Sequence, residues 1–291
     1  MSDSAQYLVV GGDSLVGGYV FDTLKSKGLK ALSTTRRVDT AGPDRIVFDF
    51  EYEATFAVPK SICCAFVVAA ATDYNRCEVD PNAYRINVEL IPRAVLSLIE
   101  QGVFVVYIST NSVFGGDQSW PSEYARHSPG IAYAKQKSQS EVAIAAMANE
   151  AGYAECYNVV RLTKILDATT PPLPSWIASW RNGNIVTPFS DLIFAPMSPH
   201  FVSNALVKLG EKRISGNFHL SGSENVSYVD LAYALAEKIG ISRSLIESTT
   251  ATEKGVHIAF KPRYSGIGMD RTTKLCGIQP QSLSSVIDDI F

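Results

Sequence analysis

Two short segments of this chain carry side chains that can move a proton. The hydroxyl residues Ser109 and Thr110 end an apolar run, and a Tyr-x-x-x-Lys pattern, Tyr133 to Lys137, follows about two dozen residues later. In a helix, Tyr133 and Lys137 lie one turn apart on the same face. A nearby ammonium favours the phenolate, so it makes a phenol with an ordinary pKa of roughly 10 a better acid. Carbonyl reduction needs such an acid, which protonates the oxygen while hydride reaches the carbon.

The Tyr-x-x-x-Lys pattern alone is weak, because it also occurs on solvated helix faces. A glycine-rich turn near the N-terminus strengthens the interpretation of Tyr133 and Lys137 as catalytic residues. An apolar run at residues 7–10 leads into Gly11-Gly12-Asp13-Ser14-Leu15-Val16-Gly17, and apolar residues at helical spacing follow. The start of a helix offers free N–H groups and a positive dipole end to a pyrophosphate. Gly11 would make the tight turn, and Gly17 would let helix and strand pack closely.

Ser14 stands at the position of the middle glycine of a Gly-x-x-Gly-x-x-Gly turn. Its side chain would either crowd the phosphates or donate a hydrogen bond to them, and we favour the second role. The next predicted strand, 29–34, leads into Thr35, Arg36 and Arg37 rather than into an acidic residue. Guanidinium groups suit a phosphate dianion, so this segment predicts NADP rather than NAD. The alternative is that both arginines are ordinary surface residues.

Composition narrows the classes of function. The chain has 291 residues and a net charge of −3 without a basic block, which argues against nucleic acid as a partner. No apolar run reaches membrane-spanning length, and residues 1–6 do not form a leader. The five cysteines show no C-x-x-C, so we expect buried free thiols in a reducing cytoplasm. The four histidines lack metal-ligand spacing, and no metal site is predicted.

Strands and helices alternate through the first half of the chain, which predicts an α/β fold, a Rossmann-type doubly wound parallel sheet. The later pattern differs and predicts a smaller C-terminal substrate-binding lobe. We expect a nucleotide-binding domain over 1–165 and the lobe mainly over 166–291, with 200–222 rejoining the sheet. The expected strands are 6–10, 29–34, 44–49, 62–70, 103–108 and 155–162, and the expected helices are 14–27, 78–101 (kinked or split at Pro92) and 131–151.

With these motifs in place, the chain resembles the extended short-chain dehydrogenase/reductases, and within them the dTDP-4-dehydrorhamnose reductases. The similar segments run through most of the chain: 11–17, 69–74, 77–78, Pro81, 84–87, 108–110, 113–114, Tyr133 with Lys137, 161–163, 218–222 and 261–265.

The resemblance implies a cytoplasmic reductase that uses NADP (NADPH) to reduce the 4-keto group of a nucleotide-linked deoxysugar. A homodimer is compatible with the resemblance but is not required by it. It implies that Thr110 binds the substrate oxygen, Tyr133 is the acid, and Lys137 lowers the pKa of Tyr133. The implied cofactor contacts are Gly11, Ser14, Leu15, Val16, Gly17, Thr35, Arg36, Arg37, Asp49, Phe50, Ala69, Ala70, Ala71, Asn87, Ser109, Tyr133, Lys137 and Arg161. The implied substrate contacts are Thr72, Asn111, Ser112, Thr163 and Trp176.

Two other functions stay open at this stage. One is a nucleotide-sugar epimerase or dehydratase that retains its cofactor. The other is a regulatory subunit that binds NADP without turnover, as in the related β subunit of methionine adenosyltransferase. The reductases carry Asp-Tyr where this chain has Asn111-Ser112, which suggests a different sugar. The joint presence of Thr110, Tyr133 and Lys137 favours an enzyme over a regulatory subunit.

Overall fold

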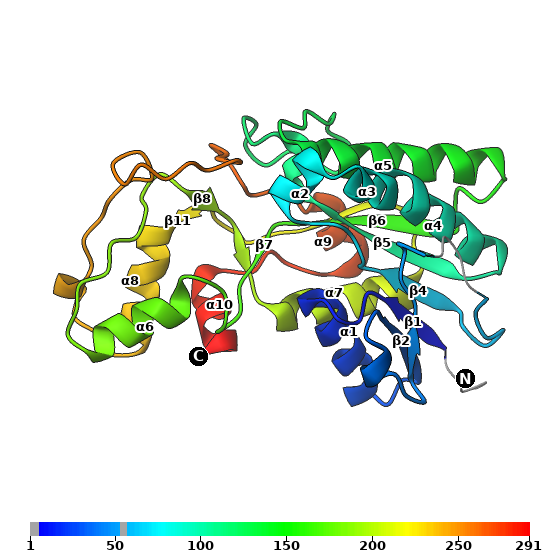
Figure 1. Cartoon of the computed structure of the whole chain (residues 1–291), viewed down its shortest axis with the longest axis horizontal. Coiled ribbons are helices and arrows are strands. Elements are labelled where there is room, and N and C mark those ends of the chain that lie inside the picture. Colours follow the sequence, from blue (N-terminus) through cyan, green and yellow to red (C-terminus); the bar gives the residue numbers. More distant parts are fainter. Residues whose placement is uncertain (1–5, 53–56) are drawn as a thin grey trace.

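A parallel sheet forms the larger part of the molecule, and a smaller lobe lies at one end of it (Figure 1). The computed structural model describes residues 6–52 and 57–291. The strands of the sheet are β1 (Tyr7–Val10), β2 (Ala31–Thr35), β3 (Arg45–Val47), β4 (Cys64–Val67), β5 (Phe104–Thr110), β6 (Tyr157–Leu162) and β10 (Gly216–Leu220). Their order is β10-β6-β5-β4-β1-β2-β3 and every pair is parallel, which confirms the predicted Rossmann-type fold.

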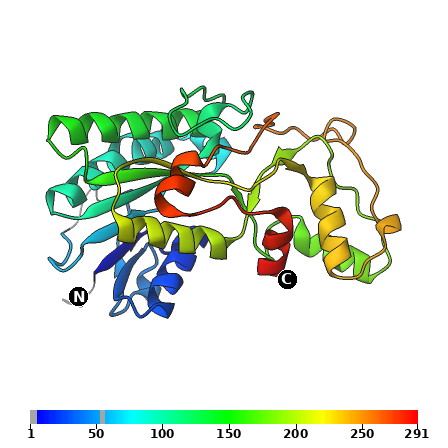
Figure 2. The same cartoon turned by 180° about the vertical axis from the view of Figure 1, so that it is seen from behind.

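Helices cover both faces of the sheet, because β1 and β4 are buried along their whole length and need an apolar cover on each side. One face packs against α1 (Leu15–Ser26) and α7 (Pro199–Lys212), which lie next to each other in the view from behind (Figure 2). The other face packs against α4 (Ile91–Glu100) and α5 (Ala132–Glu150).

The helix expected over 78–101 begins earlier and has more pieces than predicted. It consists of α2 (Tyr74–Val79), α3 (Pro81–Tyr84), a π-helical segment (Arg85–Leu90) and then α4. The side chains of Asp73 and Asp80 accept backbone N–H bonds at the starts of α2 and α3, and these caps fix the two new boundaries. Pro92 lies in the first turn of α4, where a missing N–H costs little.

The lobe has its own apolar core, which includes Leu166, Trp180, Leu231 and Val286. Two segments of the second half lie outside this lobe and pack on the sheet. They are the α7–β10 segment and α9 (Asp270–Cys276), which contacts β10. The lobe itself is made of α6 (Leu173–Arg181), α8 (Tyr228–Lys238), α10 (Leu283–Ile290) and the short strands β7 (Lys164–Ile165), β8 (Ile193–Phe194), β9 (Pro196–Met197) and β11 (Val226–Ser227).

Over residues 6–52 and 57–291, none of the helices combines the length and the apolar character that crossing a membrane would require.

Candidate active site

The glycine-rich turn is tightly constrained by its neighbours. Gly11 has φ +101°, and a Cβ there would lie 2.7 Å from the backbone nitrogen of Ala69. A Cβ on Gly17 would lie 2.1 Å from the carbonyl oxygen of Gly11. Both positions therefore require glycine, as the sequence predicted. The first turn of α1 leaves backbone N–H groups without intrahelical acceptors, which is the usual basis of pyrophosphate binding.

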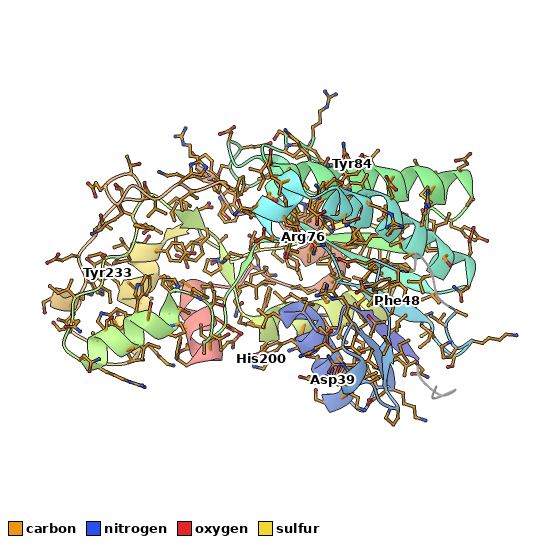
Figure 3. The ribbon with its side chains drawn as sticks, viewed as in Figure 1. Asp39, Phe48, Arg76, Tyr84, His200 and Tyr233 are labelled. Carbon is orange, nitrogen blue, oxygen red and sulfur yellow. The ribbon has the colours of Figure 1, made fainter. Side chains whose placement is uncertain are left out.

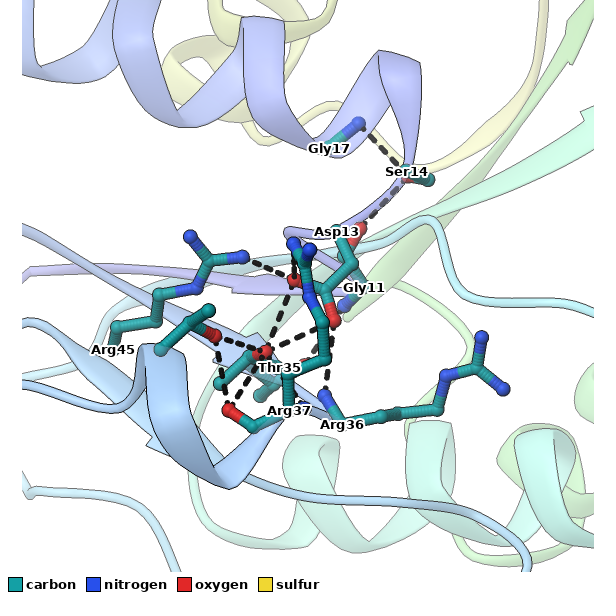
Figure 4. Close-up of polar contacts among 10 residues, drawn as sticks. Gly11, Asp13, Ser14, Gly17, Thr35, Arg36, Arg37 and Arg45 are labelled. Atoms are coloured by element: carbon teal, nitrogen blue, oxygen red, sulfur yellow. Dashed lines mark hydrogen bonds and ion pairs between the residues drawn. The ribbon is translucent and has the colours of Figure 1, made fainter.

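Ser14 caps α1. Its hydroxyl donates to the carbonyl oxygen of Gly11 over 2.8 Å and accepts from the N–H of Gly17 over 3.1 Å (Figure 4). The proton of this hydroxyl is therefore directed into the turn itself. A hydrogen bond to a cofactor phosphate would require the proton to turn away from Gly11.

Asp13 binds the segment that follows β2. Its carboxylate accepts from the hydroxyl of Thr35 and the N–H of Arg36, and it pairs with the guanidinium groups of Arg37 and Arg45 (Figure 4). Burial acts to raise the pKa of Asp13, but these hydrogen bonds outweigh burial and lower it. The side chain of Arg36 extends away from Asp13, and no ion pair of Arg36 is present among the described residues.

A cleft of about 380 Å³, here called the glycine-loop cleft, runs past the ends of β1, β2 and β4. Phe48 and Arg76, both labelled in Figure 3, belong to its walls. The predicted cofactor residues that line it are Gly11, Ser14, Arg36, Asp49, Phe50, Ala69, Ala70 and Ala71. Other predicted side chains lie elsewhere: Thr35 is 2% exposed and bonded to Asp13, and Arg37 is paired with Asp13.

Asn87 supports this cleft from behind. It lies in the π-helical segment, is fully buried, and exchanges two hydrogen bonds of 2.9 Å with the backbone N–H and carbonyl of Ala71. Its amide also donates to Gln136 on α5 over 2.8 Å. Asn87 thus fixes the backbone at Ala71, where the cleft wall continues beyond β4.

Tyr133 and Thr110 meet where α5 faces the end of β5. Both side chains line the same cleft at this place. Burial raises the pKa of Tyr133, and the neighbouring Tyr74 and Cys77 raise it further, against the lowering effect of Thr110. The ring of Tyr74 lies 5.5 Å from that of Tyr133, centroid to centroid. Tyr133 is therefore protonated at neutral pH and can act as a proton donor.

Lys137 lies one helical turn beyond Tyr133 and is 2% exposed. Its ammonium donates to the hydroxyl of Tyr107 over 2.6 Å and to the carbonyl oxygen of Ile108 over 2.7 Å. Burial lowers the pKa of Lys137 to about 7, while Glu141 acts in the opposite direction. The ammonium faces β5, and the expected lowering of the Tyr133 pKa by Lys137 stays a prediction.

Two predicted cofactor residues belong to a buried polar cluster under the site. Arg161 on β6 pairs with Glu141 on α5, with a guanidinium nitrogen 2.7 Å from the carboxylate, and Ser109 donates to the same carboxylate. His127 and His219, far apart in the sequence, both contact Arg161. Burial lowers the pKa of His219 to about 3, so it is neutral. These interactions occupy Arg161 and Ser109 within the protein core. No local sequence pattern points to Glu141.

A second cleft of about 600 Å³, here called the inter-lobe cleft, lies between the sheet and the lobe. Thr72 lines both clefts, so the two adjoin. The inter-lobe cleft is lined by Thr72, Tyr74, Thr110, Asn111, Tyr133, Leu162, Thr163, Lys164, Ile165, Leu192, Ile193, Phe194, Tyr228, Ile258, Phe260, Pro262 and Ser265. It brings together the predicted residues Thr72, Asn111 and Thr163 with Thr110 and Tyr133.

Two predicted substrate residues do not line either cleft. Ser112 is 1% exposed, and its hydroxyl lies 3.0 Å from that of Thr110, so it supports Thr110 from the side. Trp176 belongs to the lobe core, where its ring contacts those of Trp180 and Tyr228. Its i, i+4 spacing to Trp180 is the signal that could have placed it in a core.

The remaining reactive side chains are dispersed. The five cysteines are all free, with Cys64, Cys77 and Cys276 buried but Cys63 and Cys156 only partly so. Burial raises the pKa of Cys64, Cys77 and Cys276, so these thiols stay protonated at neutral pH. Within the described part of the chain, no group of three or more His, Cys, Asp or Glu side chains could hold a metal ion.

The parallel sheet, the capped glycine turn and the Thr110, Tyr133 and Lys137 group define a short-chain dehydrogenase/reductase-type protein, an oxidoreductase. The chain belongs to the RmlD substrate binding domain family, whose model matches residues 5–291.

The individual relatives share 25% sequence identity or less with this chain. The chain is 25% identical over 276 residues to a probable low-salt glycan biosynthesis reductase, Agl14 of Haloferax volcanii, covering 88% of this chain and 87% of that protein. The dTDP-4-dehydrorhamnose reductase of Bacillus anthracis, solved in complex with NADP, superposes with TM-score 0.80 at 16% identity over 99% of this chain and 98% of its own. MoeE5, solved with UDP-glucose and NAD, superposes with TM-score 0.76 at 20% identity over 98% of each chain.

Proposed function

We propose that this chain is an NADPH-dependent reductase of the 4-keto group of a nucleotide-linked deoxysugar. The observation that carries the proposal is that Tyr133 and Thr110 line the same inter-lobe cleft, next to the glycine-loop cleft. A carbonyl oxygen held by both hydroxyls would face the mouth of the nucleotide-binding cleft. The family match and the reductase among the curated relatives support the same reaction.

The residues of the glycine-loop cleft fit a dinucleotide. Gly11 and Gly17 leave no room for side chains, and the N-terminus of α1 can bind a pyrophosphate. Arg36 lines the cleft, and its guanidinium has no ion pair with any residue of 6–52 or 57–291, which suits the 2′-phosphate of NADP. When bound, NADPH supplies the hydride.

The side chains of this protein supply the proton and the electrostatic support. Tyr133 enters the reaction protonated, since burial raises its pKa, and it donates to the oxygen as negative charge develops there. Thr110 offers a second hydroxyl to the same oxygen. The Lys137 ammonium donates two of its protons to Tyr107 and Ile108, which leaves one N–H for a ligand group.

The walls of the inter-lobe cleft fit a nucleotide sugar. Phe194, Tyr228 and Phe260 offer apolar and aromatic surface, and Thr72, Asn111 and Thr163 offer polar groups near Tyr133. The amide of Asn111 donates to the backbone oxygen of Ser265 over 2.8 Å, so one wall of the cleft is tied to the sheet side. The oxygen of that amide accepts from the Thr110 hydroxyl over 3.4 Å and keeps a second lone pair for a sugar hydroxyl.

The test is NADPH oxidation by the purified protein with a panel of dTDP- and UDP-linked 4-keto-sugars, followed by cofactor absorbance and by product analysis. We expect net NADPH oxidation with at least one keto-sugar and a loss of roughly 10²–10⁴-fold in the Tyr133→Phe variant. Sugar conversion without net oxidation would instead indicate an epimerase or dehydratase. NADPH binding without conversion of any nucleotide sugar would indicate a regulatory subunit.

A further inference from the structure

Lys164 is the single charged side chain among the described residues that line the inter-lobe cleft. It lies on β7, two residues beyond Leu162, which pairs with Thr110 across β5 and β6. Lys164 therefore lines the same cleft as Thr110 and Tyr133, where the substrate oxygen would be bound. No carboxylate is present among the described residues that line this cleft, so an anionic ligand would meet no like charge there.

The ammonium of Lys164 has no ion pair among the described residues, unlike Lys25, Lys238 and Lys261, which each pair with an aspartate. The Lys164 side chain is exposed in the cleft, and desolvation by the surrounding protein lowers its pKa. An ammonium that loses water without gaining an anion is electrostatically unfavourable. An anionic ligand in the cleft would relieve this cost.

We infer that Lys164 binds an oxyanion of the substrate, an inference that rests on the proposed nucleotide-sugar reduction. A nucleotide sugar offers the oxyanion from two sources, the diphosphate between sugar and nucleoside or a carboxylate carried by the sugar. Both would accept a charge-assisted hydrogen bond from the ammonium. The aromatic walls from Phe194, Tyr228 and Phe260 would hold the uncharged rings of the same molecule.

Calorimetric titration of the NADP-saturated protein tests this without turnover. The probes are UDP-glucose, UDP-glucuronic acid, dTDP-glucose and the neutral nucleoside uridine. The variants are Lys164→Met, which removes the charge at similar length, and Lys164→Arg, which keeps it. The matched control is Lys212→Met, at the exposed end of α7.

We expect Lys164→Met to weaken nucleotide-sugar binding by about tenfold or more, the effect of one charge-assisted hydrogen bond, and to leave uridine unchanged. Lys164→Arg should retain most of the affinity, and Lys212→Met all of it. Added NaCl should weaken binding by the parent more than by Lys164→Met, because screening acts on the charge. An unchanged affinity for NADP shows that the Met variant is folded.

The probes distinguish the two sources of the oxyanion, the diphosphate and a sugar carboxylate. An equal loss for UDP-glucose and UDP-glucuronic acid assigns the contact to the diphosphate, and a loss confined to UDP-glucuronic acid assigns it to a sugar carboxylate. The inference is overturned if the parent and Lys164→Met bind all three nucleotide sugars equally, or if the parent binds none of them. Failure of NADPH oxidation, by contrast, would contradict the proposed reduction. It would not affect the comparison of nucleotide-sugar affinities between the parent and Lys164→Met.

Discussion

The ammonium of Lys137 donates a hydrogen bond to the hydroxyl of Tyr107 over 2.6 Å and lies 4.2 Å from the centroid of the same ring. The Tyr107 hydroxyl in turn donates to Ser140 over 2.8 Å. Burial strongly raises the pKa of Tyr107, so the phenol stays neutral beside the cation. Tyr107 thus positions Lys137 through both its hydroxyl and its ring, from the strand that ends in Thr110.

The first prediction removes this hydroxyl. Tyr107→Phe keeps the ring over the ammonium but leaves one buried N–H of Lys137 without its acceptor. We expect the free energy of unfolding to fall by about 2 kcal/mol, in the range of a hydrogen bond to a charged group. We also expect the Lys137 pKa to fall, so the alkaline limb of the pH–rate profile moves to lower pH. Urea unfolding and the pH–rate profile measure the two effects.

Tyr157→Phe is the matched control for this variant, since Tyr157 is only partly buried on β6 and makes no contact with Lys137. It should change neither measurement appreciably. A Tyr107→Phe variant with parental stability and an unmoved profile would show that the ring alone holds Lys137.

The second prediction concerns stability against pH. Burial lowers the pKa of folded Lys137 to about 7, whereas the unfolded chain restores its ordinary value of 10.5. Between these values the unfolded state binds more protons, so the contribution of Lys137 to the free energy of unfolding rises with pH. The free energy of unfolding of the parent minus that of Lys137→Met should therefore rise from about pH 7 towards pH 10 and stay flat below pH 7. Urea unfolding in the absence of cofactor, at several pH values, measures this signed difference. A signed difference that falls with rising pH would contradict a buried lysine with a lowered pKa.

The third prediction separates the two arginines after β2. Arg36 lines the glycine-loop cleft and has no ion pair within the part of the chain that the structure describes, whereas Arg37 is paired with Asp13 at 3.2 Å. Arg36→Ala should weaken NADPH by about tenfold or more, the effect of a charge-assisted phosphate contact, with little effect on NADH. Arg37→Ala should affect both cofactors weakly. Fluorescence titration of each variant with each cofactor makes the comparison, and equal affinity of the parent for NADPH and NADH would refute phosphate selection by Arg36.

The fourth prediction concerns the cap at Ser14. Its hydroxyl accepts from Gly17 at the start of α1, so Ser14→Ala should lower the free energy of unfolding by about 1 kcal/mol, and Ser14→Gly by only a few tenths. NADPH titration of the glycine variant answers a separate question. Weaker binding would support a hydroxyl contact to phosphate, and tighter binding would show that the side chain crowds the pyrophosphate.

The alternation of strands and helices was sufficient to predict the sheet and the turn at Gly11, because periodicity and glycine positions are local signals. The convergence of Thr110 and Tyr133 followed from a strand end and a helix face. The hydrogen bonds of Asp13 could not be predicted this way, since they join the glycine turn to residues more than twenty positions away. The same holds for Arg161 and Glu141, whose pairing depends on the packing of α5 against β6.

Trp176 shows another limit of sequence patterns. An aromatic residue on a short amphipathic helix fits a ligand cleft or a packed core, and the i, i+4 spacing to Trp180 is the one local signal that favours the core in which α8 places it. Lys164 cannot be recognised from the sequence for a related reason. A lone lysine after a strand carries no pattern, and its significance comes from the uncharged residues that surround it in the folded chain.

The chain passes between its sheet core and its lobe core several times, which affects truncation, proteolysis and opening of the inter-lobe cleft. Residues 166–194, 226–246 and 283–290 contribute to the lobe core, whereas segments between them return to the sheet core. A protein truncated after Ile165 would lack β10 and the cover that α7 gives the sheet, so we expect it to aggregate. A protease that cleaves one connection would leave two fragments still associated. Any widening of the inter-lobe cleft must bend all the connections together, which favours small, concerted movements over free rotation about one hinge.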